Sequence, residues 1–251
     1  EYLRRWDHSL LRIGHGNGNG YGFEGLPQKG NVRATHWGIT LRQIGQLLVN
    51  VKLLPSVECC SSDDIDNNDM CVRNFVKKVL IPRTRDKGMG YALMVNEDNA
   101  LQVQVLVSHT WDEGILELYF ALKTVVGMDV PLFVCFFSMY QNSDEPPDIK
   151  SAGVSITEQL GNDATRGPFA EVLNMFLHEQ NLRLHRTTDR NLVKQSKGAN
   201  NMHSYMTSKS NELTCGYMVV VPTKYCEIFS RMWCCLEIYT AMNMGIPMFM
   251  R

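Results

Sequence analysis

Four short apolar runs in the second half of the chain have the composition of buried β-strands. They alternate with segments whose apolar residues recur every three or four positions, the spacing of one helix face. The runs are 101–107, 130–137, 218–221 and 246–250, and helices are expected at about 115–125, 168–179 and 232–242. Strands that are apolar throughout and alternate with helices are typical of a parallel sheet covered on both faces. The pattern predicts an α/β fold with an open, doubly wound sheet.

Residues 37–97 carry a different pattern, with apolar residues at helical spacing in 40–54 and 72–81. Pro55 and Pro82 follow these stretches. We expect each proline to end its helix, because proline cannot donate the backbone hydrogen bond that a helix interior needs. The segment is therefore predicted to be a helical extension that precedes an α/β domain at 98–251.

Residues 1–36 lack apolar periodicity, and 14–25 are rich in glycine and asparagine. Within this tract, Gly20-x-Gly22-x-x-Gly25 has the spacing of the dinucleotide-binding fingerprint. That fingerprint requires a strand before it and a helix after it, and the flanking residues predict neither. We expect 1–36 to be a flexible segment.

Residues 182–212 interrupt the alternation of strands and helices. They are basic, polar and without apolar periodicity, so we expect a polar insertion that runs over the surface. Apart from Tyr205, the basic part of this segment lacks the aromatic side chains on which bases would stack. The pattern indicates a solvated loop and does not favour a nucleic-acid-binding arm.

Charge and hydropathy exclude some partners. Lys and Arg total 25 against 26 Asp and Glu, so no overall positive field attracts nucleic acid or an anionic membrane. No apolar run approaches the ~20 residues of a membrane span. We predict neither nucleic acid nor membrane as a partner.

The eight cysteines do not form paired CxxC motifs, so no structural zinc site is predicted. Several lie in apolar runs, where cysteine packs as a small hydrophobic residue. This usage indicates a reducing compartment, and we predict a cytoplasmic location. The chain begins at Glu1 without an initiator methionine and stops within an apolar run, so we expect it to be a piece of a longer protein.

Polar residues follow the first and third predicted strands, where an open α/β sheet binds its ligands. If these strands are neighbours, their carboxyl ends and the helix after the third strand would share one cleft. The residues that would meet there are Ser108, His109, Thr110, Trp111 and Asp112 after the first strand, Lys224 and Tyr225 after the third, and Glu237 on the helix.

Two of these segments resemble TIR (Toll-receptor-type) domains. The run at 219–221, the Pro-Thr-Lys-Tyr turn at 222–225 and the Arg-Met-Trp-Cys-Cys-Leu-Glu sequence at 231–237 resemble the strand, loop and helix that carry the family's Trp-Cys-x-x-Glu motif. The sequence at 107–112 is similar to the family's opening strand, and protist proteins share the Ser-His-x-Trp and Arg-x-Trp-Cys-x-x-Glu motifs. The resemblance covers about 80–251. It implies a flavodoxin-like sheet, a signalling role, and a final helix and strand beyond Arg251.

The resemblance also implies a chemistry. In the NAD-cleaving members the glutamate of the motif is catalytic, and it falls on Glu237. A carboxylate there would stabilise the positive charge that forms on ribose when its bond to nicotinamide breaks. Trp111 could stack on nicotinamide. Ser108, His109 and Lys224 could contact ribose or phosphate, with Tyr225 beside them as a further binding residue. NAD would be the substrate, and no bound cofactor or metal is implied.

Structural alternatives remain for these residues. Glu237 could cap a loop or pair with Arg231, Trp233 could pack in the core, and His109 could bond its own turn. The chain as a whole could be a non-catalytic module that self-associates, or binds other signalling domains, through 140–155 and 182–212. It could also process another nucleotide in the same crevice.

Overall fold

The structure is a computed structural model that describes residues 32–54, 70–85, 87–141, 167–195, 216–222, 228 and 231–250. Within 167–195, side chains are described as far as Leu184. Of the segment predicted to be flexible at 1–36, residues 1–31 lie outside these ranges, and the remainder contains the 3₁₀ turn η3(Ala34–His36), in which Ala34 and Thr35 are buried. Residues 142–166, 196–215 and 223–227 also lie outside the described ranges. They include most of the loop predicted at 140–155 and the rest of the predicted insertion.

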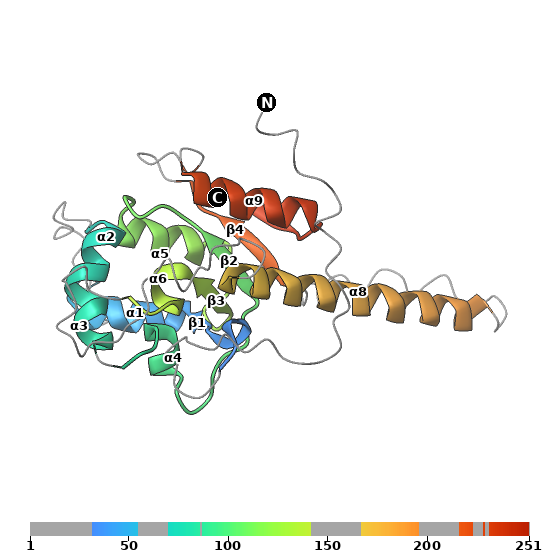
Figure 1. The fold of residues 1–251 in the computed structure, drawn as a ribbon, viewed down its shortest axis with the longest axis horizontal. Coiled ribbons are helices and arrows are strands. Elements are labelled where there is room, and N and C mark those ends of the chain that lie inside the picture. The colour runs from blue at the N-terminus through green and yellow to red at the C-terminus, as the bar shows by residue number, and fades with distance from the viewer. Residues whose placement is uncertain are drawn as a thin grey trace.

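A mixed five-stranded sheet forms the centre of the fold (Figure 1). Its strands are β1(Ile39–Thr40), β2(Val105–Ser108), β3(Pro131–Val134), β4(Tyr217–Val220) and β5(Met248–Met250), in the order β1-β3-β2-β4-β5. β2 pairs in parallel with both β3 and β4, β5 pairs in parallel with β4, and β1 is antiparallel to β3. The predicted α/β class is therefore confirmed. The first and third predicted strands, β2 and β4, are neighbours.

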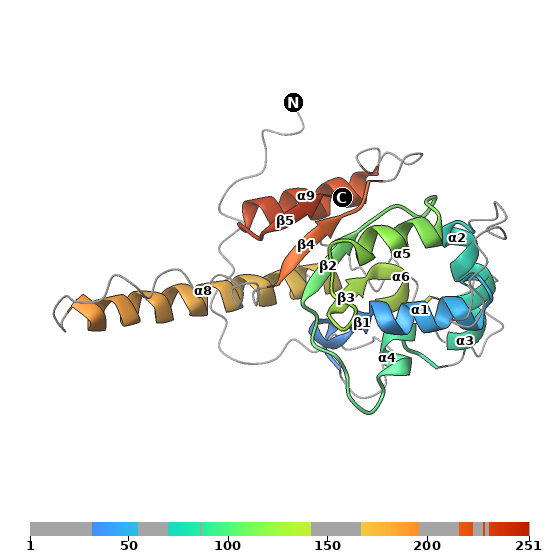
Figure 2. The same cartoon turned by 180° about the vertical axis from the view of Figure 1, so that it is seen from behind.

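Helices cover both faces of the sheet (Figures 1 and 2). Successive strand residues point to opposite faces, so Val105 and Val107 pack in one core while Leu106 packs in the other. The first core also contains α1(Leu41–Asn50) and α5(Ile115–Lys123), and the second contains α8(Pro168–Gln195) and α9(Met232–Asn243). This double covering explains why the central strands are apolar throughout.

The predicted N-terminal extension packs against the sheet. Ile39 and Thr40 form the edge strand β1, which the apolar pattern did not predict. Thr40 then caps α1 in a capping box: its Oγ1 accepts from Gln43 N at 3.2 Å, and Gln43 Oε1 accepts from Thr40 N at 3.0 Å. α1 ends at Asn50, ahead of Pro55, and Lys52 has the positive φ of 61° common just after a helix end.

The helix predicted at 72–81 continues through the proline that was expected to stop it. α2(Val72–Phe75) runs into η4(Val76–Leu80), a π-helical turn, and then into α3(Ile81–Thr84). Pro82 directly follows η4, whose π-type turn interrupts the regular i→i−4 hydrogen bonding at the point where the proline N–H is missing. The prediction that Pro82 ends the helix is wrong for this reason.

The second predicted strand is shorter than its apolar run. β3 ends at Val134, and α6(Cys135–Ser138) turns the chain, with Val134 N donating to Ser138 Oγ at 3.1 Å. α6 packs against α4(Tyr91–Val95), a short helix that begins after Gly90. Continuous apolar character could not separate the strand from this turn, because both are buried.

The long helix α8 occupies part of the segment that was predicted to be a surface loop at 182–212. The helix was expected to end near residue 179, but it continues to Gln195 and extends away from the sheet (Figure 1). A helix satisfies its own backbone hydrogen bonds, and 168–195 contains neither glycine nor an internal proline that would interrupt it. Among the described residues, no helix, α8 included, is both long and apolar enough to cross a bilayer.

Candidate functional site

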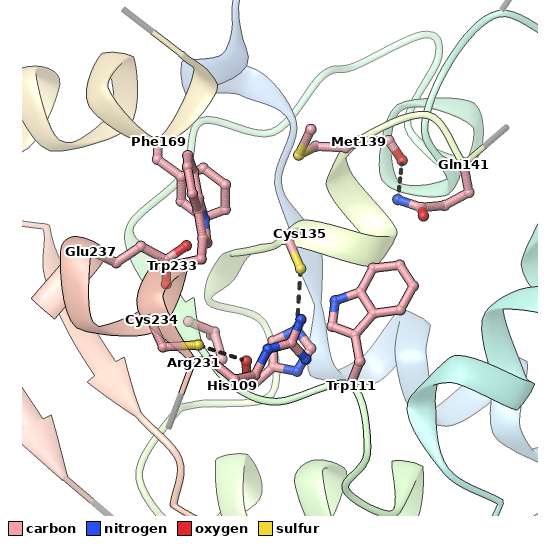
Figure 3. Close-up of a pocket in the computed structure, with 11 residues that line it drawn as sticks. His109, Trp111, Cys135, Met139, Gln141, Phe169, Arg231, Trp233, Cys234 and Glu237 are labelled. Atoms are coloured by element: carbon pink, nitrogen blue, oxygen red, sulfur yellow. Dashed lines mark hydrogen bonds between the residues drawn. The ribbon is translucent and has the colours of Figure 1, made fainter. Parts of the chain in front are cut away.

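A cavity of about 250 Å³ lies at the carboxyl ends of β2 and β3, beside the first turns of α9 (Figure 3). We call it the pocket. It is lined by Val107, His109 and Trp111 from β2 and the loop after it, Cys135, Met139 and Gln141 from α6 and beyond, Phe169 from α8, and Arg231, Trp233, Cys234 and Glu237 from α9. The position agrees with the general rule that open α/β sheets bind ligands beyond the carboxyl ends of their strands.

Glu237 reaches the pocket from the second turn of α9. Its carboxylate Oε2 accepts a hydrogen bond from Ser108 Oγ at 2.6 Å, which ties the helix to the last residue of β2. Both residues are buried, at 6% exposure for Glu237 and 1% for Ser108. The structure therefore brings together two residues that are 129 positions apart in the chain.

Burial raises the pKa of Glu237 from 4.5 to about 7, because the ionised form loses its hydration. The Ser108 hydroxyl, the charge of His109, the Trp233 indole and the charge of Arg231 lower this pKa and offset part of the effect. Neutral and ionised forms of Glu237 are both populated near neutral pH. A carboxyl group with these properties can act as an acid, a base or a charge stabiliser.

Ser108→Ala is expected to raise the pKa of Glu237 above its value of about 7. The substitution removes the hydrogen bond that favours the ionised form. Carbon-detected NMR titration of the Glu237 carboxyl measures the change. Ser138→Ala is a matched control, because Ser138 is also fully buried but its hydroxyl bonds Val134 N. An unchanged pKa in Ser108→Ala would contradict the assigned hydrogen bond.

Arg231 does not form an ion pair with Glu237, which was one structural alternative. Its Nη1 is buried and has no hydrogen-bond partner among the described residues. A buried cationic donor without a partner is costly, and planar guanidinium groups recognise carboxylates and phosphates. Because Arg231 lines the pocket, it gives the pocket a place for an anionic group.

Two tryptophans lie at the pocket and differ in their surroundings. Trp233 packs edge-to-face on Phe169, with ring centroids 5.7 Å apart, and so belongs to the second core as well. Trp111 is half-buried in the loop after β2 and lines the pocket beside Cys135 and Gln141 (Figure 3). Trp111 is therefore the aromatic ring better placed to stack on a ligand.

His109 uses both ring nitrogens in contacts within the protein. Nδ1 lies 2.9 Å from Thr110 O and 2.8 Å from Glu113 Oε1, and Nε2 lies 3.3 Å from Cys135 Sγ. The contact with Thr110 is the bond to its own turn that the sequence left as an alternative. These contacts leave neither nitrogen unpartnered for ribose or phosphate.

Sequence reasoning missed Cys135 and Glu113. Cys135 was interpreted as an apolar filler, and Glu113 was not singled out. The pairing of Val107 with Val134 brings the segments after β2 and β3 together, but the sequence does not show this register. The predicted binding residues Lys224 and Tyr225 lie outside the described residues.

In the part of the chain that the structure describes, no cluster of three or more His, Cys, Asp or Glu could hold a metal ion.

The chain matches no protein-family model, no curated protein and no solved structure at a level of similarity that marks a relative.

Proposed function

We propose that this chain is a cytoplasmic TIR-like signalling domain that cleaves NAD to nicotinamide and ADP-ribose, with Glu237 as the catalytic residue. The observation that carries the proposal is the Ser108–Glu237 hydrogen bond, which sets the glutamate of the Trp-Cys-x-x-Glu sequence at the carboxyl end of β2. The order of the four parallel strands, β3-β2-β4-β5, is the second-first-third-fourth order of flavodoxin-like sheets and supports the same proposal.

The pocket has groups suited to the nicotinamide riboside end of NAD. The nicotinamide ring of NAD carries a positive charge, which an ionised carboxylate attracts, and Trp111 offers an aromatic face. Arg231 supplies a cation for phosphate. The volume of about 250 Å³ lies below the ~300–1,000 Å³ of typical ligand sites. On this proposal the adenosine end lies outside the pocket.

The proposed reaction needs one carboxylate. When the bond between ribose C1′ and the nicotinamide nitrogen breaks, the electron pair stays on nicotinamide, which leaves neutral, and positive charge moves to the ribose ring. Ionised Glu237 stabilises that charge. Water then attacks C1′ and loses a proton, giving ADP-ribose. Because the pKa of Glu237 is about 7 in the free protein, kcat/KM should increase with pH through that value.

Glu237→Gln is expected to lower NAD cleavage by about 100-fold or more, because it removes a charge that acts on the transition state. Chromatography of nicotinamide and ADP-ribose after incubation with NAD measures the effect. Glu179→Gln is a matched control: Glu179 bonds Gln102, which precedes β2, at the opposite end of that strand from Ser108. Turnover that survives in Glu237→Gln would remove the catalytic role.

A second candidate function is a non-catalytic self-association module. It is favoured by apolar side chains at one edge of the fold, where Tyr239 and Met242 on α9 and Phe249 and Met250 on β5 are 44–61% exposed. Such a surface is typical of contacts with another protein. Wild-type protein that forms oligomers in light scattering but releases no nicotinamide in either state would favour this function over NAD cleavage.

A further inference from the structure

We propose that Cys135, His109 and Glu113 form a nucleophilic thiol site that accepts an acyl group from a carboxylate-bearing ester or amide. This activity goes beyond the cleavage of NAD and does not depend on it. The two chemistries use different reacting residues of the same pocket, since Glu237 comes from α9 and Cys135 from α6, although Arg231 and Trp111 would contact the ligand in both (Figure 3).

The three side chains form a continuous hydrogen-bonded series. Cys135 Sγ lies 3.3 Å from His109 Nε2, and His109 Nδ1 lies 2.8 Å from Glu113 Oε1. Thr110 O and the Glu113 carboxylate both accept hydrogen bonds, so Nδ1 carries a proton and Nε2 faces the thiol. A nucleophile bonded to a base that a third group orients is the arrangement of enzymes that form acyl intermediates.

The fold holds this arrangement rigidly. The His109 and Glu113 side chains are 1% and 0% exposed, and the imidazole packs edge-to-face on Phe136 with ring centroids 5.0 Å apart. Cys135 directly follows β3 and His109 directly follows β2, and these strands are paired. Cys135 is only partly buried and lines the pocket, so the sulfur is reachable while its partners are protected.

The surroundings of His109 favour the protonated form of its imidazole. Burial by itself lowers the pKa of His109, but the contacts with Cys135 and Glu113 raise it well above its usual range. A thiolate beside a protonated imidazole is the reactive form of cysteine. The hydrogen-bonded geometry therefore places the thiol of Cys135 beside a protonated ring.

Arg231 defines the class of substrate. Its buried Nη1, which lacks a partner among the described residues, is in the same pocket as Cys135. A carboxylate on the acyl group would satisfy this donor. Trp111 and Met139 add apolar surface near Cys135, which suits a short carbon chain between the carboxylate and the reacting carbonyl.

The reaction balances without a further co-reactant. His109 Nε2 holds the proton of the thiol, and the sulfur attacks the carbonyl carbon and forms a thioester. The bond from carbon to the alcohol or amine breaks, and the leaving group takes that proton. Water, losing a proton to His109, then cleaves the thioester, releases a carboxylic acid and restores the thiol.

The test uses 4-nitrophenyl hemisuccinate, an activated ester with a carboxylate, and its uncharged counterpart 4-nitrophenyl butyrate. We expect release of 4-nitrophenolate and an acyl adduct on Cys135, found by peptide mass spectrometry and removed by hydroxylamine. Cys135→Ser should lose this adduct, whereas Cys235→Ala, which alters a partly buried cysteine that does not line the pocket, should retain it. An adduct spread equally over Cys71, Cys135 and Cys235 in the folded wild type would overturn the proposal.

Two variants test the roles of the neighbouring groups. Glu113→Gln should lower the acylation rate constant by about 10-fold or more while the half-saturating ester concentration stays the same, because Glu113 positions the base. Equal acylation rates in this variant and the wild type would overturn its role. Arg231→Gln should abolish the preference for the charged ester, and a retained preference would overturn the substrate class. Thermal unfolding of each variant verifies that it is folded.

Discussion

Glu237→Gln is expected to make the folded protein more stable than the wild type above pH 7. Burial raises the pKa of Glu237 from 4.5 to about 7, so the folded state binds a proton more tightly than the unfolded state does. The stability of the wild type therefore falls as pH rises from about 4.5 to about 7. In this range Glu237 is ionised in the unfolded chain, whereas in the folded protein it still binds its proton. The full penalty is about 3 kcal/mol, and glutamine, which is neutral at every pH, does not incur it.

Urea unfolding of both proteins at pH 5 and pH 8 measures this effect. The stability difference between variant and wild type should shift in favour of the variant between the two pH values, with similar m-values. Glu179→Gln should show the same difference from the wild type at both pH values, because Glu179 does not line the pocket and bonds Gln102 at the other end of β2. A difference for Glu237→Gln that is independent of pH would contradict an ionisation penalty at this position.

The sign of this result also separates two roles of Glu237. If the carboxylate stabilises the fold, by capping a loop or pairing with a cation, the Glu237→Gln protein would be less stable than the wild type. If the carboxylate is kept in a costly environment for chemistry, the Glu237→Gln protein would be more stable and less active, the trade-off often found at active sites. The Glu237→Gln protein thus tests both, through its unfolding free energy and its NAD turnover.

The sequence was sufficient to predict the α/β class, whereas the neighbouring positions of β2 and β4 entered only as a condition of the predicted site. Buried parallel strands are apolar on both faces, and this signal does not depend on distant residues. Short elements were harder to predict. β1 has two residues, and α6 is a single turn within the apolar run that follows β3. Their identity depends on packing against other segments, and no local pattern records it.

The pocket could be predicted in part. The sheet rule correctly brought Ser108 and Glu237 to the same edge. The contact of Cys135 with His109 depends on where β3 stops, and the apolar run at 130–137 hides that point. The buried Nη1 of Arg231 is equally invisible in the sequence, because an arginine at a helix start is ordinarily solvated.

Gly90→Ala is expected to destabilise the protein by about 3 kcal/mol through a clash of the new methyl group with the backbone. A Cβ at this position would lie 2.7 Å from Ser138 C and 2.9 Å from Phe137 O, and would also meet Ser138 O. Backbone atoms cannot rotate away as a side chain does. Gly90 has φ −65° and ψ 159°, which alanine adopts freely, so the cost is steric rather than conformational.

Gly127→Ala is the matched control, because Gly127 is exposed and a Cβ there would approach only Val130 Cγ2, at 3.2 Å. We expect it to change stability by less than about 1 kcal/mol. Relief of the clash at Gly90 requires α4 and α6 to separate, and α6 begins with Cys135. Gly90→Ala should therefore also slow acylation of Cys135 under conditions where the variant is folded. Stability in urea equal to that of Gly127→Ala would show that α4 does not hold α6 in place, and that the thiol depends on β2 and β3 alone.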